Sequence, residues 1–218
     1  MIAEARRSFA DRTRWWRLAL AVAGGVWAAV TMPLVATAFG SPMYVWVFHF
    51  PTYVWAYRWA DDPYITFGAF AGLSFLAIGL ALLPDLGRAG WGGTVMAWLL
   101  IAGAPVCVLS YLSSPSSAPL HFLWGWEGIL LFLACGFGVA AAATAGPRWG
   151  IGLRTLLGFT FLIVVVGTIA LSYWPHASLV VLAAEAVAII IAAPRDPAFQ
   201  DEPAFAGGTP VPTDGSPL

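Results

Sequence analysis

Two acidic residues lie inside long apolar stretches of this 218-residue sequence. Glu127 follows the aromatic letters HFLWGW, and Glu185 lies in the apolar run Ala177–Ala193. An ionisable side chain in the hydrocarbon of a bilayer costs about 2.5–3.5 kcal/mol on insertion scales, so such residues usually have a function. We therefore expect both carboxyl groups to face the interior of a helix bundle and to bind an ion, a proton or a polar solute there.

Three histidines extend this pattern, because each falls in one of the three connections that we predict on the outer side of the membrane. They are His49, His121 and His176. Histidine and carboxylate together suit a divalent transition metal and equally suit a proton relay. The candidate metal ligands are His121, His176 and Glu127. The alternative is that each histidine is an interfacial residue with an amphipathic ring.

We expect the two glutamates to line one cavity that opens outward past the histidines. Three further charged side chains are expected at its mouth, namely Arg58, Asp61 and Asp62. A repeated Leu-Ser-Tyr triplet, which ends at Tyr111 and again at Tyr173, precedes a histidine and then a glutamate in both cases. This repeat is either a duplicated two-helix unit or a coincidence. No pattern in the sequence indicates a cofactor.

The composition indicates a membrane protein. Hydrophobic residues make up 60% of the chain and charged residues 10%, whereas soluble domains average about 45–50% and about 25%. A soluble fold of this size could not bury so much apolar surface, so we expect lipid to solvate most of it. All ten basic residues are arginine, which excludes a Schiff-base lysine and a phosphate-loop lysine. Nothing indicates a nucleic-acid partner.

Six apolar windows have roughly the length that a transmembrane helix needs, about 20 residues. The sequence therefore predicts an all-α, polytopic transmembrane helix bundle of about six spans within residues 18–193. Residues 1–17 form an arginine-rich cytoplasmic N-terminus, and residues 194–218, rich in Pro, Gly and acids, are expected to be a disordered cytoplasmic tail. The windows are Leu18–Phe39, Tyr64–Leu83, Gly93–Leu112, Leu120–Ala143, Thr155–Tyr173 and Ala177–Ala193.

The distribution of arginine sets the predicted orientation. With the N-terminus inside, nine arginines lie in cytoplasmic segments and only Arg58 lies outside. This bias is typical of cytoplasmic loops. It predicts a multi-pass protein with both termini in the cytoplasm. Arginine-only usage with abundant Ala, Gly and Trp indicates a bacterial source, so we expect the bacterial plasma (inner) membrane.

Residues 41–63 form an aromatic segment after the first span, SPMYVWVFHFPTYVWAYRWADDP. Tryptophan and tyrosine favour the headgroup region, so we place this segment on the outer surface. A helix that lies on the membrane and a re-entrant lid are both compatible with the pattern. Counting it as a seventh span would leave six arginines inside and four outside.

Small residues predict where the spans pack closely, because helices in lipid associate through close backbone approach. Gly68 and Gly72 form one such surface, and Gly136 with Gly138 form another. Gly125 and Gly128 are expected to give the fourth span a face for a close neighbour. Cys107 and Cys135 differ in predicted depth by roughly 12 Å, which is too far for a disulfide.

The sequence is compatible with three functions. The leading one is the binding or translocation of a small solute, proton or metal ion through an intramembrane cavity that contains both glutamates. The alternative is a non-catalytic accessory or scaffold subunit of a larger membrane complex, with the tail or the aromatic segment as the contact to a membrane-protein partner. A membrane enzyme that acts on a lipid or isoprenoid at the outer leaflet is the third, although none of the enzyme motifs considered is present.

Overall fold

The computed structural model describes residues 2–38, 58–171 and 173–194. Its secondary structure in these ranges is entirely helical. Two short 3₁₀ turns precede α6 and α7, η1 (His121–Leu123) and η2 (Pro147–Trp149). The α-helices are α1 (Ile2–Ala38), α3 (Pro63–Ala69), α4 (Ala71–Arg88), α5 (Trp91–Leu112), α6 (Trp126–Thr144), α7 (Gly150–Leu171) and α8 (His176–Ala192).

Five of the helical segments are long and apolar enough to cross a membrane. Each of the six predicted windows falls on helical structure. The second covers parts of α3 and α4, and the sixth falls on α8, which is apolar but has only 17 residues. The helical bundle predicted from the sequence is therefore confirmed, and the number of spans stays a prediction. His49, most of the aromatic segment and the predicted tail beyond residue 194 lie outside the described residues.

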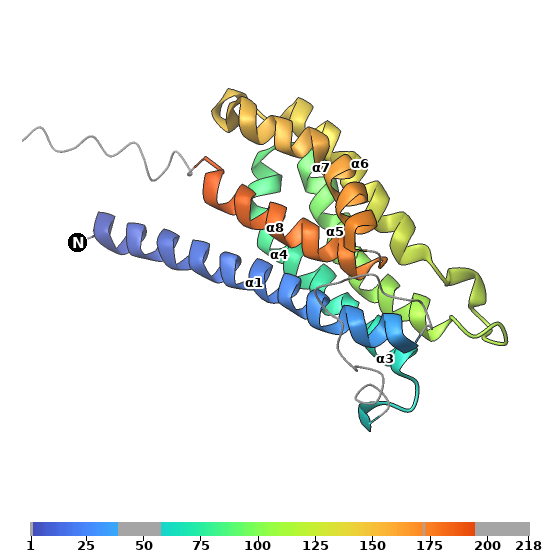
Figure 1. Ribbon diagram of the computed structural model, residues 1–218. Helices are drawn as coiled ribbons and strands as arrows, with labels where there is room; N and C mark the ends of the chain where they lie inside the picture. The colour runs from blue at the N-terminus through green and yellow to red at the C-terminus, as the bar shows by residue number, and fades with distance from the viewer. Residues whose placement is uncertain (1, 39–57, 172, 195–218) are drawn as a thin grey trace, which may run out of the picture.

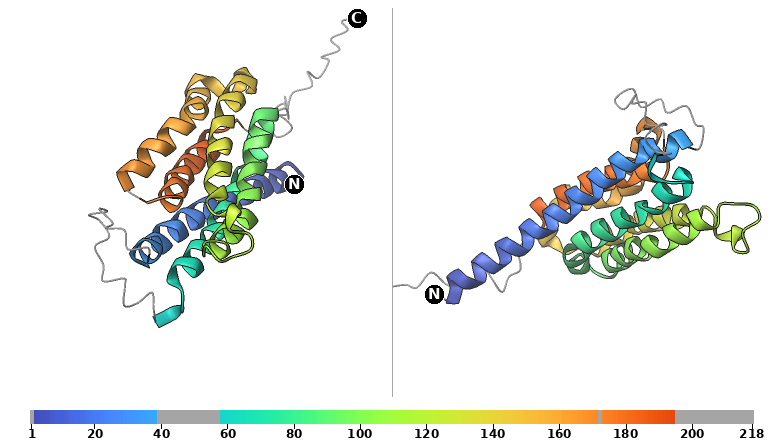
Figure 2. Two further views of the ribbon diagram at one scale, coloured as in Figure 1. Left: turned by 90° about the vertical axis from the view of Figure 1, so that its right-hand side faces the viewer. Right: turned by 90° about the horizontal axis from the view of Figure 1, so that it is seen from below.

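The long helices form a closed ring in which each helix packs on the next one along the chain. The order is α1, α4, α5, α6, α7 and α8, and α8 then returns to pack on α1 and also on α4 (Figures 1 and 2). The first turns of α1 extend beyond the neighbouring helix ends (Figure 2, right). Because the chain reverses at each connection, helix ends that are distant in sequence meet at two opposite ends of the bundle.

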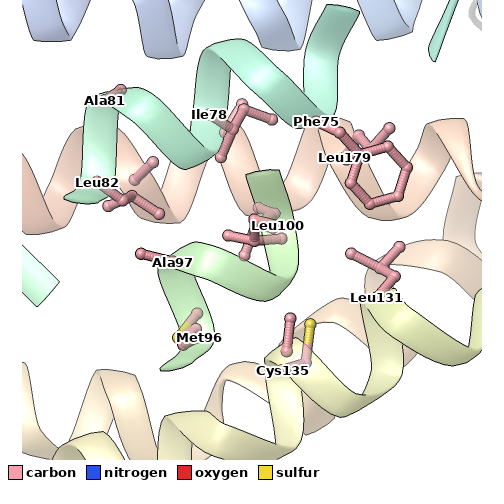
Figure 3. Close-up of a cluster of buried hydrophobic side chains, with 14 of the residues drawn as sticks. Phe75, Ile78, Ala81, Leu82, Met96, Ala97, Leu100, Leu131, Cys135 and Leu179 are labelled. Carbon is pink, nitrogen blue, oxygen red and sulfur yellow. The ribbon is translucent and has the colours of Figure 1, made fainter. Parts of the chain in front are cut away.

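Most of the interior of the ring is apolar. Side chains from α4, α5, α6 and α8 point toward one another in Figure 3, and each of those labelled there is fully buried. Phe75 of α4 packs so closely on Gly103 of α5 that a Cβ at Gly103 would lie 2.5 Å from the ring. Close packing of this kind gives helices in lipid their attraction, since burial from water contributes little there.

Only some of the glycines in the predicted small-residue surfaces lie at close contacts between helices. A Cβ at Gly68 would lie 2.0 Å from the Tyr111 ring, and one at Gly72 would lie 2.8 Å from the Ala104 carbonyl, so both glycines allow close contact with α5. Gly138 likewise allows α7 to approach α6. Gly136 faces open space instead, with no atom within 4 Å of the position that a Cβ would take.

One end of the bundle carries arginines that bind neighbouring helices. Arg14 Nε donates to the Ile190 carbonyl of α8 at 3.1 Å, Arg17 Nε donates to a carbonyl of α4 at 2.9 Å, and Arg154 Nε donates to a carbonyl of α6 at 2.9 Å. We call this the arginine end, defined by these three residues with Asp85 and Arg88. Cations near helix C-termini are stabilised by the unsatisfied carbonyl groups there.

Candidate functional site

Glu127 is the second residue of α6, at the end of the bundle opposite the arginines. The helix begins late in its predicted window because Gly125 adopts a left-handed conformation (φ 86°) and forms the N-cap. The prediction that Gly125 packs against a neighbour is wrong, since no atom lies within 4 Å of its Cβ position; its role is conformational. Gly128 does pack closely, against the Trp174 ring.

Hydroxyl groups of four residues interact with the Glu127 carboxyl group. The Ser110 hydroxyl lies within hydrogen-bonding reach of it and also accepts from the Gly125 N–H at 2.8 Å. Glu127 acts electrostatically on the hydroxyl groups of three tyrosines. We call these residues together the tyrosine cluster: Tyr64, Ser110, Tyr111, Glu127 and Tyr173.

The three tyrosines come from two helices, α3 and α5, and from the connection between α7 and α8. The Tyr64 and Tyr111 ring centroids are 5.2 Å apart, and the Tyr111 and Tyr173 hydroxyl groups hydrogen-bond to each other. Trp124 Nε1 donates to the Tyr64 hydroxyl at 3.1 Å. Gly68 makes this arrangement feasible because a larger residue would occupy the space of the Tyr111 ring. The tyrosines that end the two Leu-Ser-Tyr triplets thus meet in space, although a duplicated unit stays a prediction.

His176 borders the cluster at the start of α8 and is fully buried. Its ring centroid lies 5.6 Å from that of Tyr173, and Nε2 lies 3.4 Å from the Phe67 carbonyl oxygen. Nδ1 has no hydrogen-bond partner among the described residues. Burial of an unsatisfied polar atom is costly and rare, so such an atom often indicates a ligand, water or proton that binds there.

Glu127 also has a buried polar atom without a hydrogen-bond partner. Its side chain is only 5% exposed, and Oε2 is buried without a partner in the described chain. No described arginine forms an ion pair with it, whereas the buried Asp85 at the other end pairs with both Arg17 and Arg88. An unpaired buried carboxyl group can take up a proton or a cation.

Glu185 occupies a different place from Glu127. It lies in the middle of α8, where Oε1 accepts a hydrogen bond from Thr160 of α7, and it acts electrostatically on Cys135 of α6. Cys135 follows Glu127 by eight residues on α6, which corresponds to about 12 Å along the helix axis. Each acid therefore has its own set of neighbours, and the structure gives no contact between them.

The other predicted residues lie at the tyrosine end with separate contacts. His121 Nδ1 bonds to the Ser113 carbonyl at 3.0 Å, and its ring stacks on Trp124. Asp62 caps α3, since its Oδ1 accepts from the Ile65 N–H at 3.0 Å. Arg58 and Asp61 are exposed.

The described residues contain no group of three or more His, Cys, Asp or Glu side chains that could hold a metal ion. Of the candidate ligands, His176 borders the tyrosine cluster that contains Glu127, and His121 stacks on Trp124, which donates to Tyr64. A metal site at these residues stays a prediction. Cys107 and Cys135 are both buried free thiols, so the predicted absence of a disulfide is confirmed.

Sequence reasoning missed most of the tyrosine cluster and all of the Asp85 site. Tyr111 and Tyr173 carried a usable signal, because the same triplet ends two successive hairpins. Tyr64 and Asp85 carried none beyond their positions near the ends of an apolar window. No family model matches the chain, and comparison with curated proteins and with solved structures finds no similar protein.

Proposed function

We propose that the protein is a multi-pass membrane protein that binds and translocates a small cation, the proton included, at the tyrosine cluster. One observation carries this proposal: Glu127 is buried without a basic partner among the described residues, and one of its carboxyl oxygens has no hydrogen-bond partner there. An acid that stabilised the fold would be expected to have its partner in place, as Asp85 does.

The surroundings favour a positive ligand. The carboxyl group supplies negative charge, and tyrosine rings present a negative face that attracts cations within about 6 Å. The described arginines that form ion pairs or bind helix carbonyls are at the opposite end of the bundle. An anion would therefore meet no compensating charge from those side chains.

We further propose that the tyrosine end faces outward and the arginine end faces the cytoplasm, in the plasma membrane of a bacterium. The excess of arginine in the segments at one end supports this orientation. In it, α8 is the sixth span, and a cation arriving from outside reaches Glu127 within the first turn of α6.

Purified protein in proteoliposomes tests the function. Uptake and binding are measured for protons, Na⁺, K⁺, Zn²⁺ and tetramethylammonium, with wild type, Glu127→Gln and the double variant Glu127→Gln with Glu185→Gln. We expect wild type to bind or move at least one of these cations and Glu127→Gln to lose that activity while its thermal unfolding stays unchanged. If Glu127→Gln behaved as wild type toward every cation, the proposal would be abandoned, whatever the double variant did.

A second candidate function is that of an accessory subunit, and an apolar groove favours it. The groove has a volume of about 720 Å³ and runs along the surface of α6, with Phe161 of α7 as its one lining residue from another helix. Five of its lining residues follow heptad spacing along α6: Ile129, Phe132, Gly136, Val139 and Ala143. This spacing suits a packed helix, and the open Gly136 allows close backbone approach. We take the occupant to be a transmembrane helix of a partner protein.

Two glycine variants test this alternative. Gly136→Ile fills the groove, whereas Gly152→Ile is a matched control, because Gly152 also has open space around its Cβ position and lies outside the groove. A photo-crosslinker at Val139 should form a stoichiometric adduct that Gly136→Ile removes and Gly152→Ile preserves. Purification in mild detergent as a lone, monodisperse species that binds its own cation would exclude the accessory role.

A further inference from the structure

Glu185 and its two neighbours, Thr160 and Cys135, each lie near the middle of their own helix. This position is apart from the tyrosine cluster. Glu185 is the tenth of the 17 residues of α8, and its partner Thr160 is the eleventh of the 22 residues of α7. Cys135, on which it acts electrostatically, is the tenth of the 19 residues of α6. Glu185 is 4% exposed, so it is buried midway between the two ends of the bundle.

The carboxyl group of Glu185 is only half satisfied. Oε1 accepts from the Thr160 hydroxyl, and Oε2 is buried with no partner in the described chain. The segments of α1, α4 and α7 that lie beside the middle of α8 contain no ionisable residue, and α6 contributes only the Cys135 thiol. No described basic side chain compensates a negative charge here, in contrast to the arginines around Asp85.

The number of ligand atoms identifies what could bind at this position. Calcium takes six to eight oxygen ligands, magnesium takes six, and structural zinc takes four nitrogen, sulfur or oxygen ligands. Glu185 and Thr160 supply one carboxyl group and one hydroxyl group, and the helix carbonyls nearby are engaged in helical hydrogen bonds. A proton needs only the carboxyl oxygen. It also removes the charge that would otherwise be buried without a partner.

We propose that Glu185 is a proton-binding site in the middle of the bundle, separate from the cation site at Glu127. In its protonated form the carboxyl group is neutral and accepts from Thr160 through Oε1, with the proton on Oε2. When the proton leaves, the Thr160 hydroxyl and the Cys135 thiol are the polar groups that remain beside the carboxylate.

Infrared difference spectroscopy of the full-length protein in lipid tests this site without any transport assay. A pH titration should reveal a carboxylic-acid C=O band that shifts in heavy water and disappears reversibly as the pH rises. Glu185→Gln should remove this band. Thr160→Val, which removes the hydroxyl group and keeps the shape, should move it to higher frequency because the carbonyl oxygen loses its hydrogen bond.

Glu127→Gln is the matched control, because it should leave the Glu185 band in place. This separates the two proposals: a Glu127→Gln variant with unchanged cation binding overturns only the function proposed for the tyrosine cluster. The proton site is overturned if Glu185→Gln retains every carboxylic-acid band, if the band does not respond to heavy water and pH, or if Thr160→Val leaves its frequency unchanged.

Discussion

The two ends of the bundle bury the same kind of group in opposite ways. At the arginine end, Asp85 is 1% exposed and forms ion pairs with Arg17 of α1 and Arg88 of its own helix. At the tyrosine end, Glu127 is 5% exposed and has hydroxyl neighbours but no basic partner among the described residues. A paired acid joins two helices, whereas an unpaired acid leaves a place for a ligand.

Substitutions at the two ends should therefore affect different properties, stability at one end and binding at the other. Removal of one member of a buried ion pair leaves the other charge uncompensated, which is strongly destabilising. Removal of an unpaired acid leaves no such charge behind. Substitutions at the arginine end should therefore change the free energy of unfolding, and isosteric substitution of Glu127 should change binding.

Asp85→Asn should have the largest effect on stability. The guanidinium group of Arg17, whose side chain is 14% exposed, would lose its ionic partner inside the bundle. We expect a loss of about 3 kcal/mol in the free energy of unfolding, the lower part of the range for broken buried pairs, because Arg88 is more exposed. Unfolding in a mild detergent measures it. If Asp85→Asn unfolded like wild type, the ion pairs would not hold α1 to α4.

Gly68→Ala should have the next largest effect and should act at the tyrosine end. The added Cβ would lie 2.0 Å from the Tyr111 ring, so the ring must leave its present position beside Tyr64. Overpacking of this kind costs typically about 1–3 kcal/mol, and cation binding should fall with it.

Gly87→Ala is the matched control for Gly68→Ala, because Gly87 lies on the same helical segment with no atom within 4 Å of its Cβ position. It should be neutral or stabilising by up to about 1 kcal/mol, since alanine favours helix. Equal behaviour of the two alanine variants in thermal unfolding would show that Gly68 is not required for the position of Tyr111.

Arg14→Ala should have a smaller effect. Arg14 donates to the carbonyl groups of Ile190 and Ile191 near the C-terminal end of α8, and these bonds would be lost. We expect a decrease of about 1.5 kcal/mol in the free energy of unfolding, as for other bonds to charged groups. Arg12, which is exposed, serves as the control for Arg14. Arg12→Ala should change the free energy of unfolding by less than about 0.5 kcal/mol. A larger loss from Arg12→Ala would place the important contacts elsewhere.

Hydropathy was sufficient to locate the helices, because each span must satisfy its backbone within lipid and so appears as a long apolar window. It could not give the depth or rotation of one helix relative to another. The start of α6 at Trp126 depends on the left-handed Gly125, and the predicted window began six residues earlier at Leu120. For the same reason the sequence placed Glu127 and Glu185 in one cavity, whereas their neighbours in the structure differ.

Sequence position alone also identified only part of the candidate site. The cost of an acid in lipid identified Glu127 and Glu185 from position alone. The tyrosines could not be identified in this way, because an aromatic residue near a span end is equally typical of the membrane interface. Asp85 was overlooked because its partner Arg17 precedes it by 68 residues, and only the packing of α1 on α4 brings the two together.

The most direct test compares cation binding by wild type and Glu127→Gln, with the cation that the proteoliposome assay identifies and with folded protein in lipid nanodiscs. The two proteins should unfold within about 1 kcal/mol of each other, because the amide keeps the shape and the hydrogen bond from Ser110. Glu127→Gln should bind the cation at least about tenfold more weakly, since a contact to a charged group contributes about 1.5–3 kcal/mol. Equal affinity of the two proteins would contradict the assignment of the tyrosine cluster as the binding site.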